Sequence, residues 1–240
     1  MSQKSLSIIA LSDDNLKKSI NVLANTAKHI PHEKIILLTS KVDIQKSDNP
    51  EISIIKVEPI SSSAKYNNFV IYKLHKFIDT THALIVQWDG QILNPKKWSE
   101  KFLNYDFVGA PFIPREYDFN YCRDKNYNFY VIGNGGFTIR SKRLLESAIK
   151  YDLKDDISYT NNHEDGFYSV LHREFLESKN FTWADFSTAK EFCLETPLSL
   201  DDIFSFPLGF HGRKMLLISK FLFFIVFFKK LKTKLISLLK

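Results

Sequence analysis

The sequence predicts an α/β fold in which helices cover both faces of a largely parallel sheet. Up to residue 90, apolar runs alternate with segments of helical periodicity in the order strand, helix, strand, strand, helix, strand. The runs are apolar throughout, as expected for parallel strands that are buried on both faces. With 240 residues, 44% hydrophobic and 25% charged, the chain can bury a full core.

Four strands and two helices are predicted in the first half of the chain. The strands are the apolar runs at residues 5–12, 33–40, 52–60 and 82–90. The first helix spans 15–30, ends before Pro31 and is expected to be capped by Asp13-Asp14. The second helix spans 69–80 and follows the polar connection 61–68.

The second half alternates between short elements and polar connections. In chain order we expect a helix at 95–105, a strand at 106–112, a polar loop at 114–128, a strand at 130–141, and helices at 141–151 and 163–180. Asn134-Gly135-Gly136 kinks the strand at 130–141, because two successive glycines weaken regular pairing. No G-x-G-x-x-G or P-loop motif is present, so dinucleotide and P-loop binding sites are not predicted.

Charge is distributed unevenly along the chain. The net charge is +6, but residues 213–240 contain eight basic and no acidic residues, which leaves residues 1–212 with a net charge of −2. A nucleic-acid-binding domain would carry its positive charge on the folded body, so nucleic acid is not an expected partner. The two cysteines, Cys122 and Cys193, and the absence of a secretory signal pattern favour the cytoplasm.

The basic tail predicts attachment to a membrane surface. Its apolar run at 221–228 is eight residues long, whereas a spanning helix needs about 20. Basic residues beside aromatic and aliphatic ones are typical of an amphipathic helix that lies on anionic lipid. The alternative is a terminal helix that packs on the body or on a second subunit. We therefore expect a domain at 1–214 and a basic, Phe-rich membrane-surface segment at 215–240.

Four short motifs contain residues that could perform chemistry. Asp89 follows a buried strand, where parallel sheets bind ligands, and could bind a divalent cation; alternatively it forms an Asp-Gly turn. The glycines of Asn134-Gly135-Gly136 allow close approach of a ligand, or form a bulge. Two further motifs are Glu164-Asp165 and His211-Gly212-Arg213-Lys214.

The acidic and the histidine motifs each have two interpretations. Glu164 and Asp165 could stabilise a helix N-terminus through the helix dipole, or one of them could act as a general base. His211 could ligate a metal while Arg213 and Lys214 neutralise a phosphate, or it could be a loop residue beside the basic tail. Each motif alone is weak evidence, and their order is more informative.

Taken in order, these motifs resemble a bacterial and fungal family of GT-A-like glycosyltransferases, mostly described as a domain of unknown function. The resemblance covers about residues 54–215. It is carried by five blocks, namely QWDG at 87–90, YDFVGAP at 105–111, GNGGFTIR at 133–140, HEDGF at 163–167 and GFHG at 209–212. It implies a Rossmann-type mixed sheet flanked by helices, followed here by a C-terminal amphipathic helix.

The resemblance also implies roles for individual residues. GT-A enzymes hold Mn²⁺ or Mg²⁺ with an Asp-x-Asp at a strand end; here Gln87 replaces the first Asp, so Asp89 is the acidic ligand. His211 is implied as a second ligand, with Arg213 and Lys214 on the donor diphosphate. The implied acceptor side comprises Asn134, Gly135 and Gly136 with the catalytic pair Glu164 and Asp165.

We therefore expect a glycosyltransferase. It would transfer a sugar from a nucleotide-sugar to a glycan or lipid-linked acceptor at the inner face of the cytoplasmic membrane, in bacterial surface polysaccharide synthesis. The leaving diphosphate requires a cation, and the attacking hydroxyl requires a base. One alternative is metal-independent transfer that uses Arg213 and Lys214. Another is a non-catalytic glycan-binding or scaffold protein that retains the fold.

Overall fold

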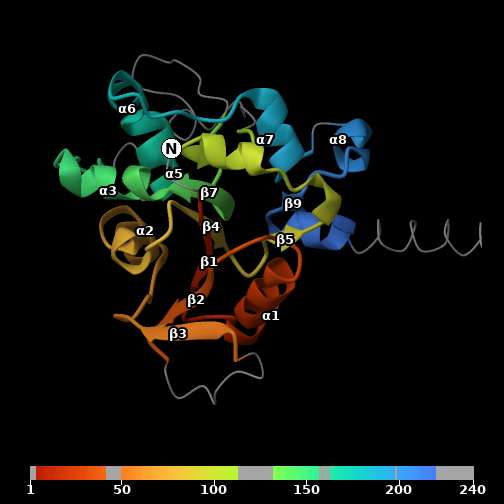
Figure 1. Ribbon diagram of the computed structural model, residues 1–240, viewed down its shortest axis with the longest axis horizontal. Helices are drawn as coiled ribbons and strands as arrows, with labels where there is room; N and C mark the ends of the chain where they lie inside the picture. Colours follow the sequence, from red (N-terminus) through yellow and green to blue (C-terminus); the bar gives the residue numbers. More distant parts are fainter. Residues whose placement is uncertain are drawn as a thin grey trace, which may run out of the picture.

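A mixed six-stranded sheet forms the centre of the protein in a computed structural model that describes residues 4–41, 50–112, 132–156, 160, 163–197 and 199–219 (Figure 1). The strand order is β3-β2-β1-β4-β7-β6. The strands are β1 (Leu6–Leu11), β2 (Lys34–Thr39), β3 (Ile52–Lys56), β4 (His82–Val86), β6 (Phe107–Val108) and β7 (Phe137–Ser141). Neighbours from β3 to β4 pair in parallel, whereas β7 is antiparallel to both β4 and β6. The predicted α/β class, with a mixed sheet flanked by helices, is confirmed.

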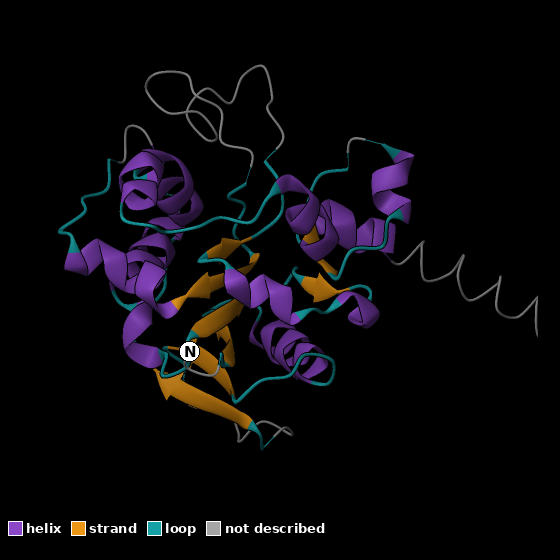
Figure 2. Cartoon of the chain, turned by 45° about the horizontal axis from the view of Figure 1, so that its top comes forward, coloured by secondary structure: helices purple, strands orange, loops and turns teal. Residues whose placement is uncertain are grey.

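Alternate residues of the parallel strands enter separate cores on the two faces of the sheet. One core contains Ile8, Ile35 and Leu84 and is covered by α1 (Leu16–Ala27). The other contains their neighbours along each strand and is covered by α2 (Ser63–Tyr72). This two-sided burial explains why the strands are apolar throughout, and helices flank the sheet in both views (Figures 1 and 2).

The remaining elements cover the antiparallel end of the sheet and build a second, small sheet. The helical segments are η1 (Leu74–Phe77), η2 (Pro95–Lys97), η3 (Glu100–Asn104), α3 (Lys142–Lys150), α5 (Glu164–Gly166), the π-helical η4 (Phe167–Leu171), α6 (Arg173–Ser178), α7 (Phe186–Phe192) and α8 (Leu200–Phe204). The small sheet has the order β5-β9-β8 and consists of β5 (Gln91–Ile92), β9 (Gly209–Phe210) and β8 (Cys193–Leu194). It places the segment after β9 beside the segment after β4.

Several predicted boundaries are wrong for local reasons. The segment 61–68 is not merely a polar connection: α2 starts at Ser63, because the Ser62 side chain accepts a hydrogen bond from the Lys65 amide and caps the helix. The predicted helix at 95–105 consists of the two short 3₁₀ segments η2 and η3. The predicted loop at 114–128 lies outside the described residues.

The described part of the tail begins as a helix that packs on the domain. Residues 213–219 are helical, and Met215 is buried against Leu194 and Phe210. Leu217, by contrast, leaves 70% of its side chain exposed. No helix among the described residues is both long and apolar enough to cross a bilayer. The rest of the expected amphipathic segment, 220–240, lies outside the described residues.

Asp13 joins three elements at the carboxyl edge of the sheet instead of capping α1. The N-cap residue of α1 is Asn15, which makes no side-chain cap hydrogen bond. The Asp13 carboxylate accepts hydrogen bonds from Thr39 Oγ1, Ser40 N, Ser40 Oγ and Ile60 N, at 2.7–2.9 Å. Partial burial tends to raise the pKa of Asp13, but these bonds outweigh it and hold the pKa below 3.8.

Replacing Asp13 should therefore destabilise the fold. We expect Asp13→Ala to lower the free energy of unfolding by about 2–4 kcal/mol, because four charge-assisted hydrogen bonds are lost together. Since the native pKa of Asp13 is depressed, this contribution is present above its ordinary pKa and is lost as the pH falls through the native value. Urea unfolding between about pH 7 and about pH 3 measures it. Asp14, the exposed neighbour, provides the control. If Asp14→Ala lowered the free energy of unfolding as much as Asp13→Ala does, the prediction would be wrong.

Candidate active site

A cleft of about 290 Å³ lies at the carboxyl edge of the parallel strands. Its walls come from the segments that follow β1 and β4 and from the start of α2; they include Ser12, Asp13, Ser19, Ser62, Tyr66, Gln87 and Trp88. Ser19 Oγ is buried and has no hydrogen-bond partner within the described chain. The cleft is thus polar and can accept hydrogen bonds and donate them to a ligand of small-molecule size.

Asp89 and His211 meet beside this cleft. The Gly212 amide donates a hydrogen bond of 3.2 Å to the Asp89 carbonyl, so the segment after β9 is held against the segment after β4. Asp89 Oδ1 lies 3.4 Å from His211 Nε2 and has no hydrogen-bond partner within the described chain. The Asp89 carboxylate is thus within ion-pair range of the imidazole.

Gln87 contacts the same nitrogen of His211. Its Oε1 lies 3.2 Å from His211 Nε2, and its Nε2 donates a hydrogen bond of 3.1 Å to the Tyr66 hydroxyl. Two oxygen atoms, from Gln87 and Asp89, therefore lie near one imidazole nitrogen. Carboxylate and amide oxygens suit hard divalent cations, and imidazole is a common ligand of transition metals. Gln87, Asp89 and His211 are therefore the residues that would hold a divalent cation at this place.

Glu195 is a neighbour of His211 that the sequence analysis did not identify. Its Oε1 lies 3.5 Å from His211 Nδ1, on the other side of the ring from Asp89. Among the described residues, no three His, Cys, Asp or Glu side chains are arranged to hold one metal ion, which agrees with Asp89 and Glu195 facing different ring nitrogens. Glu195 is therefore placed to orient His211. It follows the two-residue strand β8, which has no recognisable pattern.

The two carboxylates determine the charge of His211. Burial alone would lower the pKa of His211, but Asp89 and Glu195 outweigh it and raise the pKa to about 10. Conversely, burial tends to raise the pKa of Asp89, while His211 and Arg213 lower it overall. The imidazole is thus cationic near neutral pH, and a bound metal would have to replace its proton.

Trp88 holds cations at the mouth of the cleft. Lys18 Nζ lies 4.4 Å and Arg213 Cζ 5.3 Å from the centre of its indole ring. Arg213 also lies close enough to Asp89 to lower the pKa of that carboxyl. Lys214 is exposed, and no hydrogen bond or ion pair links it to the described site residues. Lys18 was not identified in the sequence analysis.

The acidic pair lies on the other side of the glycines. Glu164 Oε2 accepts a 2.6 Å hydrogen bond from Arg140 Nη2, and both side chains are buried. Burial raises the pKa of Glu164, and the Arg140 guanidinium beside it opposes this shift. The Asp165 Oδ2 accepts a hydrogen bond of 3.1 Å from the Gly135 amide. Arg140 is the buried partner that the sequence did not reveal.

The glycines bring the two halves of the site together. A Cβ at Gly135 would lie 2.7 Å from Glu164 Oε1, and a Cβ at Gly136 would lie 2.3 Å from His211. Gly136 also has a φ of +68°, which favours glycine. Asn134 donates a 3.4 Å hydrogen bond to the Pro111 carbonyl and fixes the loop. The predicted acceptor residues thus lie between the acidic pair and His211.

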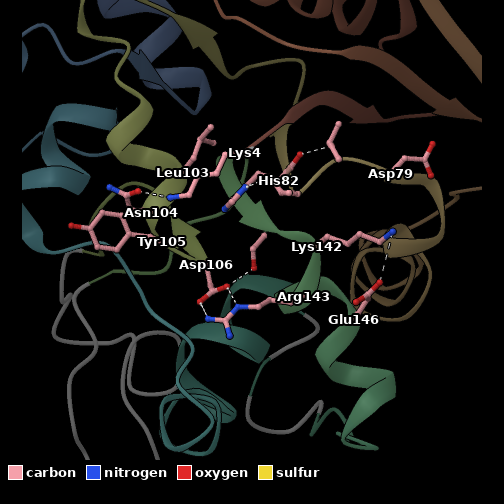
Figure 3. Close-up of a pocket in the computed structure, with 13 residues that line it drawn as sticks. Lys4, Asp79, His82, Leu103, Asn104, Tyr105, Asp106, Lys142, Arg143 and Glu146 are labelled. Carbon is pink, nitrogen blue, oxygen red and sulfur yellow. Dashed lines mark hydrogen bonds and ion pairs between the residues drawn. The ribbon is translucent and has the colours of Figure 1, made fainter. Parts of the chain in front are cut away.

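A larger pocket, of about 450 Å³, opens at the opposite end of the sheet (Figure 3). It includes Asp106 of the YDFVGAP block, whose carboxylate accepts hydrogen bonds from Ser141 Oγ, Thr182 N and the Arg143 guanidinium. Asp106 therefore ties β6, β7 and the 182 segment together. Because its charge is already used in this structural network, we place the candidate active site at the smaller cleft.

Residues 49–211 match the family described as "Protein of unknown function (DUF5672)". Similar solved structures include a glycosyltransferase involved in glycosylation of the major capsid of PBCV-1, with 12% identity, a TM-score of 0.48, and coverage of 87% of this chain and 93% of that one. The glycosyltransferase GlyE of Streptococcus pneumoniae TIGR4 has 12% identity, a TM-score of 0.41 and coverage of 87% and 54%. The bifunctional IspDF of Campylobacter jejuni has 14% identity, a TM-score of 0.43, and coverage of 66% of this chain and 47% of that one.

This chain thus spans about half the length of the last two proteins. The identities and TM-scores are too low for any of the three to indicate an activity or a substrate. No curated protein is detectably similar in sequence.

The contact between Gly136 and His211 can be tested through stability. We expect Gly136→Ala to lower the free energy of unfolding by about 1–3 kcal/mol, because the residue has a positive φ and its Cβ would overlap the imidazole. Gly166→Ala is the matched control: Gly166 is helical, and its Cβ would meet no atom closer than 3.9 Å. That change should be neutral or slightly stabilising. Equal thermal stability of the two variants would show that the overlap does not exist.

Proposed function

Given that the chain belongs to the DUF5672 family and folds as an α/β domain around a mixed six-stranded sheet, we propose that it is a glycosyltransferase. It transfers a sugar from a nucleotide-sugar donor to a hydroxyl of a glycan or lipid-linked acceptor. One observation carries this proposal: His211 with its Asp89 neighbour and a buried acidic pair lie on either side of adjacent glycines. Transfer from a nucleotide-sugar requires those two chemical functions next to each other.

The donor half of the proposed site binds the nucleotide diphosphate. The polar cleft accommodates the nucleoside, and the unpartnered Ser19 hydroxyl offers it a hydrogen bond. Asp89 and His211, with Gln87, would hold Mn²⁺ or Mg²⁺, and a bound cation supplies neutralisation of the leaving diphosphate. Arg213, held over Trp88, adds positive charge, and Lys214 reaches the same phosphates from the exposed helix start.

The acceptor half deprotonates the attacking hydroxyl. We assign Asp165 as the general base and Glu164 as the residue that orients the acceptor, which binds along Asn134, Gly135 and Gly136. The base takes the proton as the hydroxyl oxygen attacks the anomeric carbon and the diphosphate leaves. Positioned carboxylates of this kind contribute about 10²–10⁴-fold to the rate.

A cationic His211 supports the metal-independent alternative. With a pKa raised to about 10 by its two carboxylate neighbours, His211 itself carries positive charge at the diphosphate side. In that case the imidazolium, Arg213 and Lys214 would stabilise the leaving group together. The dependence of turnover on added Mn²⁺ separates the two mechanisms.

The donor-side proposal predicts the behaviour of Asp89→Asn. Incubation with a panel of nucleotide-sugars should show slow donor hydrolysis by the wild type, stimulated by Mn²⁺. The variant should lose about 10²-fold or more of this activity and its stimulation by Mn²⁺, because the carboxylate ligand is gone. Asp79→Asn, an exposed carboxylate paired with Lys34, is the control and should retain activity.

The possible outcomes of the donor panel have different consequences. Wild-type turnover by Asp89→Asn would exclude Asp89 from the donor site. Donor hydrolysis that does not depend on Mn²⁺ but is slower in the Arg213→Ala variant would establish the metal-independent mechanism. If no donor is hydrolysed or bound, the protein is not a glycosyltransferase, and a non-catalytic glycan-binding or scaffold role replaces the proposal.

We also propose that the tail holds the enzyme at the inner face of the cytoplasmic membrane, near lipid-linked acceptors of bacterial surface polysaccharide synthesis. The concentration of eight basic residues after Gly212, with no acidic residue, supports attraction to anionic lipid. The exposed Leu217, on a helix whose Met215 is buried in the domain, shows that an apolar side chain points outwards where the segment begins.

Removing the tail should therefore abolish binding to anionic vesicles. Because Met215 is part of the core, the truncation is best placed after Ser219, so that the packed helix remains. The full-length protein should sediment with phosphatidylserine-containing vesicles and be released by high salt, which screens surface charge. The truncated protein should stay in solution and keep its activity on a short soluble acceptor. Equal sedimentation of both proteins would contradict the anchor.

A further inference from the structure

A buried ion pair lies beneath the acidic pair. Arg140 points from β7 into the protein with a fully buried side chain, and Glu164 leaves only 5% of its side chain exposed. The guanidinium carbon lies 4.9 Å from the ring centre of Phe107 and 5.5 Å from that of Tyr168. Aromatic rings stabilise a cation but carry no net negative charge, so a carboxylate is needed to neutralise the buried charge of Arg140.

That carboxylate is Glu164. Within the described chain, Arg140 Nε and Nη1 are buried without a hydrogen-bond partner, and Nη2 donates to Glu164 Oε2. Protonation of Glu164 would remove the carboxylate charge that contacts this buried guanidinium, which is strongly unfavourable. Glu164 is therefore poorly suited to receive the proton of an acceptor hydroxyl.

Backbone amides contact the Asp165 carboxylate. Its Oδ2 accepts a hydrogen bond from the Gly135 amide, and its Oδ1 accepts one from the Gly166 amide. Gly135 also contacts the ion pair: its Cβ would lie 2.7 Å from Glu164 Oε1 and 3.3 Å from Arg140 Nη2. The ion pair and the Asp165 carboxylate are thus fixed against the same glycine.

We propose that Arg140 is a positioning residue of the acidic pair, which holds Glu164 as a charged, immobile carboxylate and leaves Asp165 to act as the base. This inference rests on the proposed glycosyltransferase function for the base, but the ionic state of Glu164 can be measured without any substrate. The groups that face Glu164 are Arg140, Asp165, His211, Tyr66 and Tyr168. Arg140 is the cation that contacts it directly.

The first test is carboxyl ¹³C NMR of protein labelled at glutamate, with Glu164→Gln used to assign the signal. In folded Arg140→Met, the Glu164 signal should titrate at least about one pH unit higher than in the wild type, because the neighbouring cation is lost. Arg140→Lys retains a positive charge, so its Glu164 signal should titrate close to the wild-type value. This variant also provides a measurement if Arg140→Met fails to fold. Arg143→Met, which removes the cation of a different ion pair, should leave the signal unchanged.

The second test compares turnover of the best donor. Asp165→Asn should lose about 10²–10⁴-fold in kcat. Glu164→Gln leaves the charge of Arg140 unpaired, and adding Arg140→Met removes that charge. The double variant should therefore have a kcat at least about tenfold higher than that of Glu164→Gln alone. An unmoved Glu164 titration in folded Arg140→Met, or no recovery in a folded double variant, would overturn the inference. Absence of turnover with every donor would overturn the proposed function and leave the NMR result intact.

Discussion

The antiparallel direction of β7 is the constraint on which the site depends. Because β7 runs against β4, its first residues lie beside the last residues of β4, and the Gln87 amide donates a 2.8 Å hydrogen bond to the Gly136 carbonyl. A parallel strand in that place would put its carboxyl end there instead. The reversal brings a loop of two glycines to the ligand-binding edge, between His211 and the acidic pair. Side chains of any size at these positions would separate the two.

Sequence reasoning succeeded where a pattern extends over several residues. The apolar runs of β1, β2 and β4 predicted a doubly covered sheet, because both faces of each strand are buried. The positions of Asp89 after β4 and of the acidic pair at the start of α5 were also predictable, because each follows or opens an element. The ends of elements were less predictable: the start of α2 depends on a single cap at Ser62, which a periodicity cannot reveal.

The residues that were missed have no local signal. Arg140 occurs in a short strand, where a charged residue is ordinarily expected on an exposed face, and its burial depends on Glu164, 24 positions away. Glu195 follows a strand of two residues and meets His211 only through the parallel pairing of β8 with β9. Contacts between distant segments set both roles, and one sequence does not encode such contacts as a pattern.

The short helix after Gly212 has a consequence for how the molecule is held. A helix rises about 1.5 Å per residue, so residues 213–219 advance about 10 Å from the segment that contains His211. Met215 fixes the base of this helix in the core, while Arg213 stays over Trp88. These seven residues are therefore a short, fixed spacer between the last described residue, Ser219, and the segment that contains His211. Under the proposed anchoring, lengthening or shortening this spacer would change the distance between a membrane surface and the proposed site.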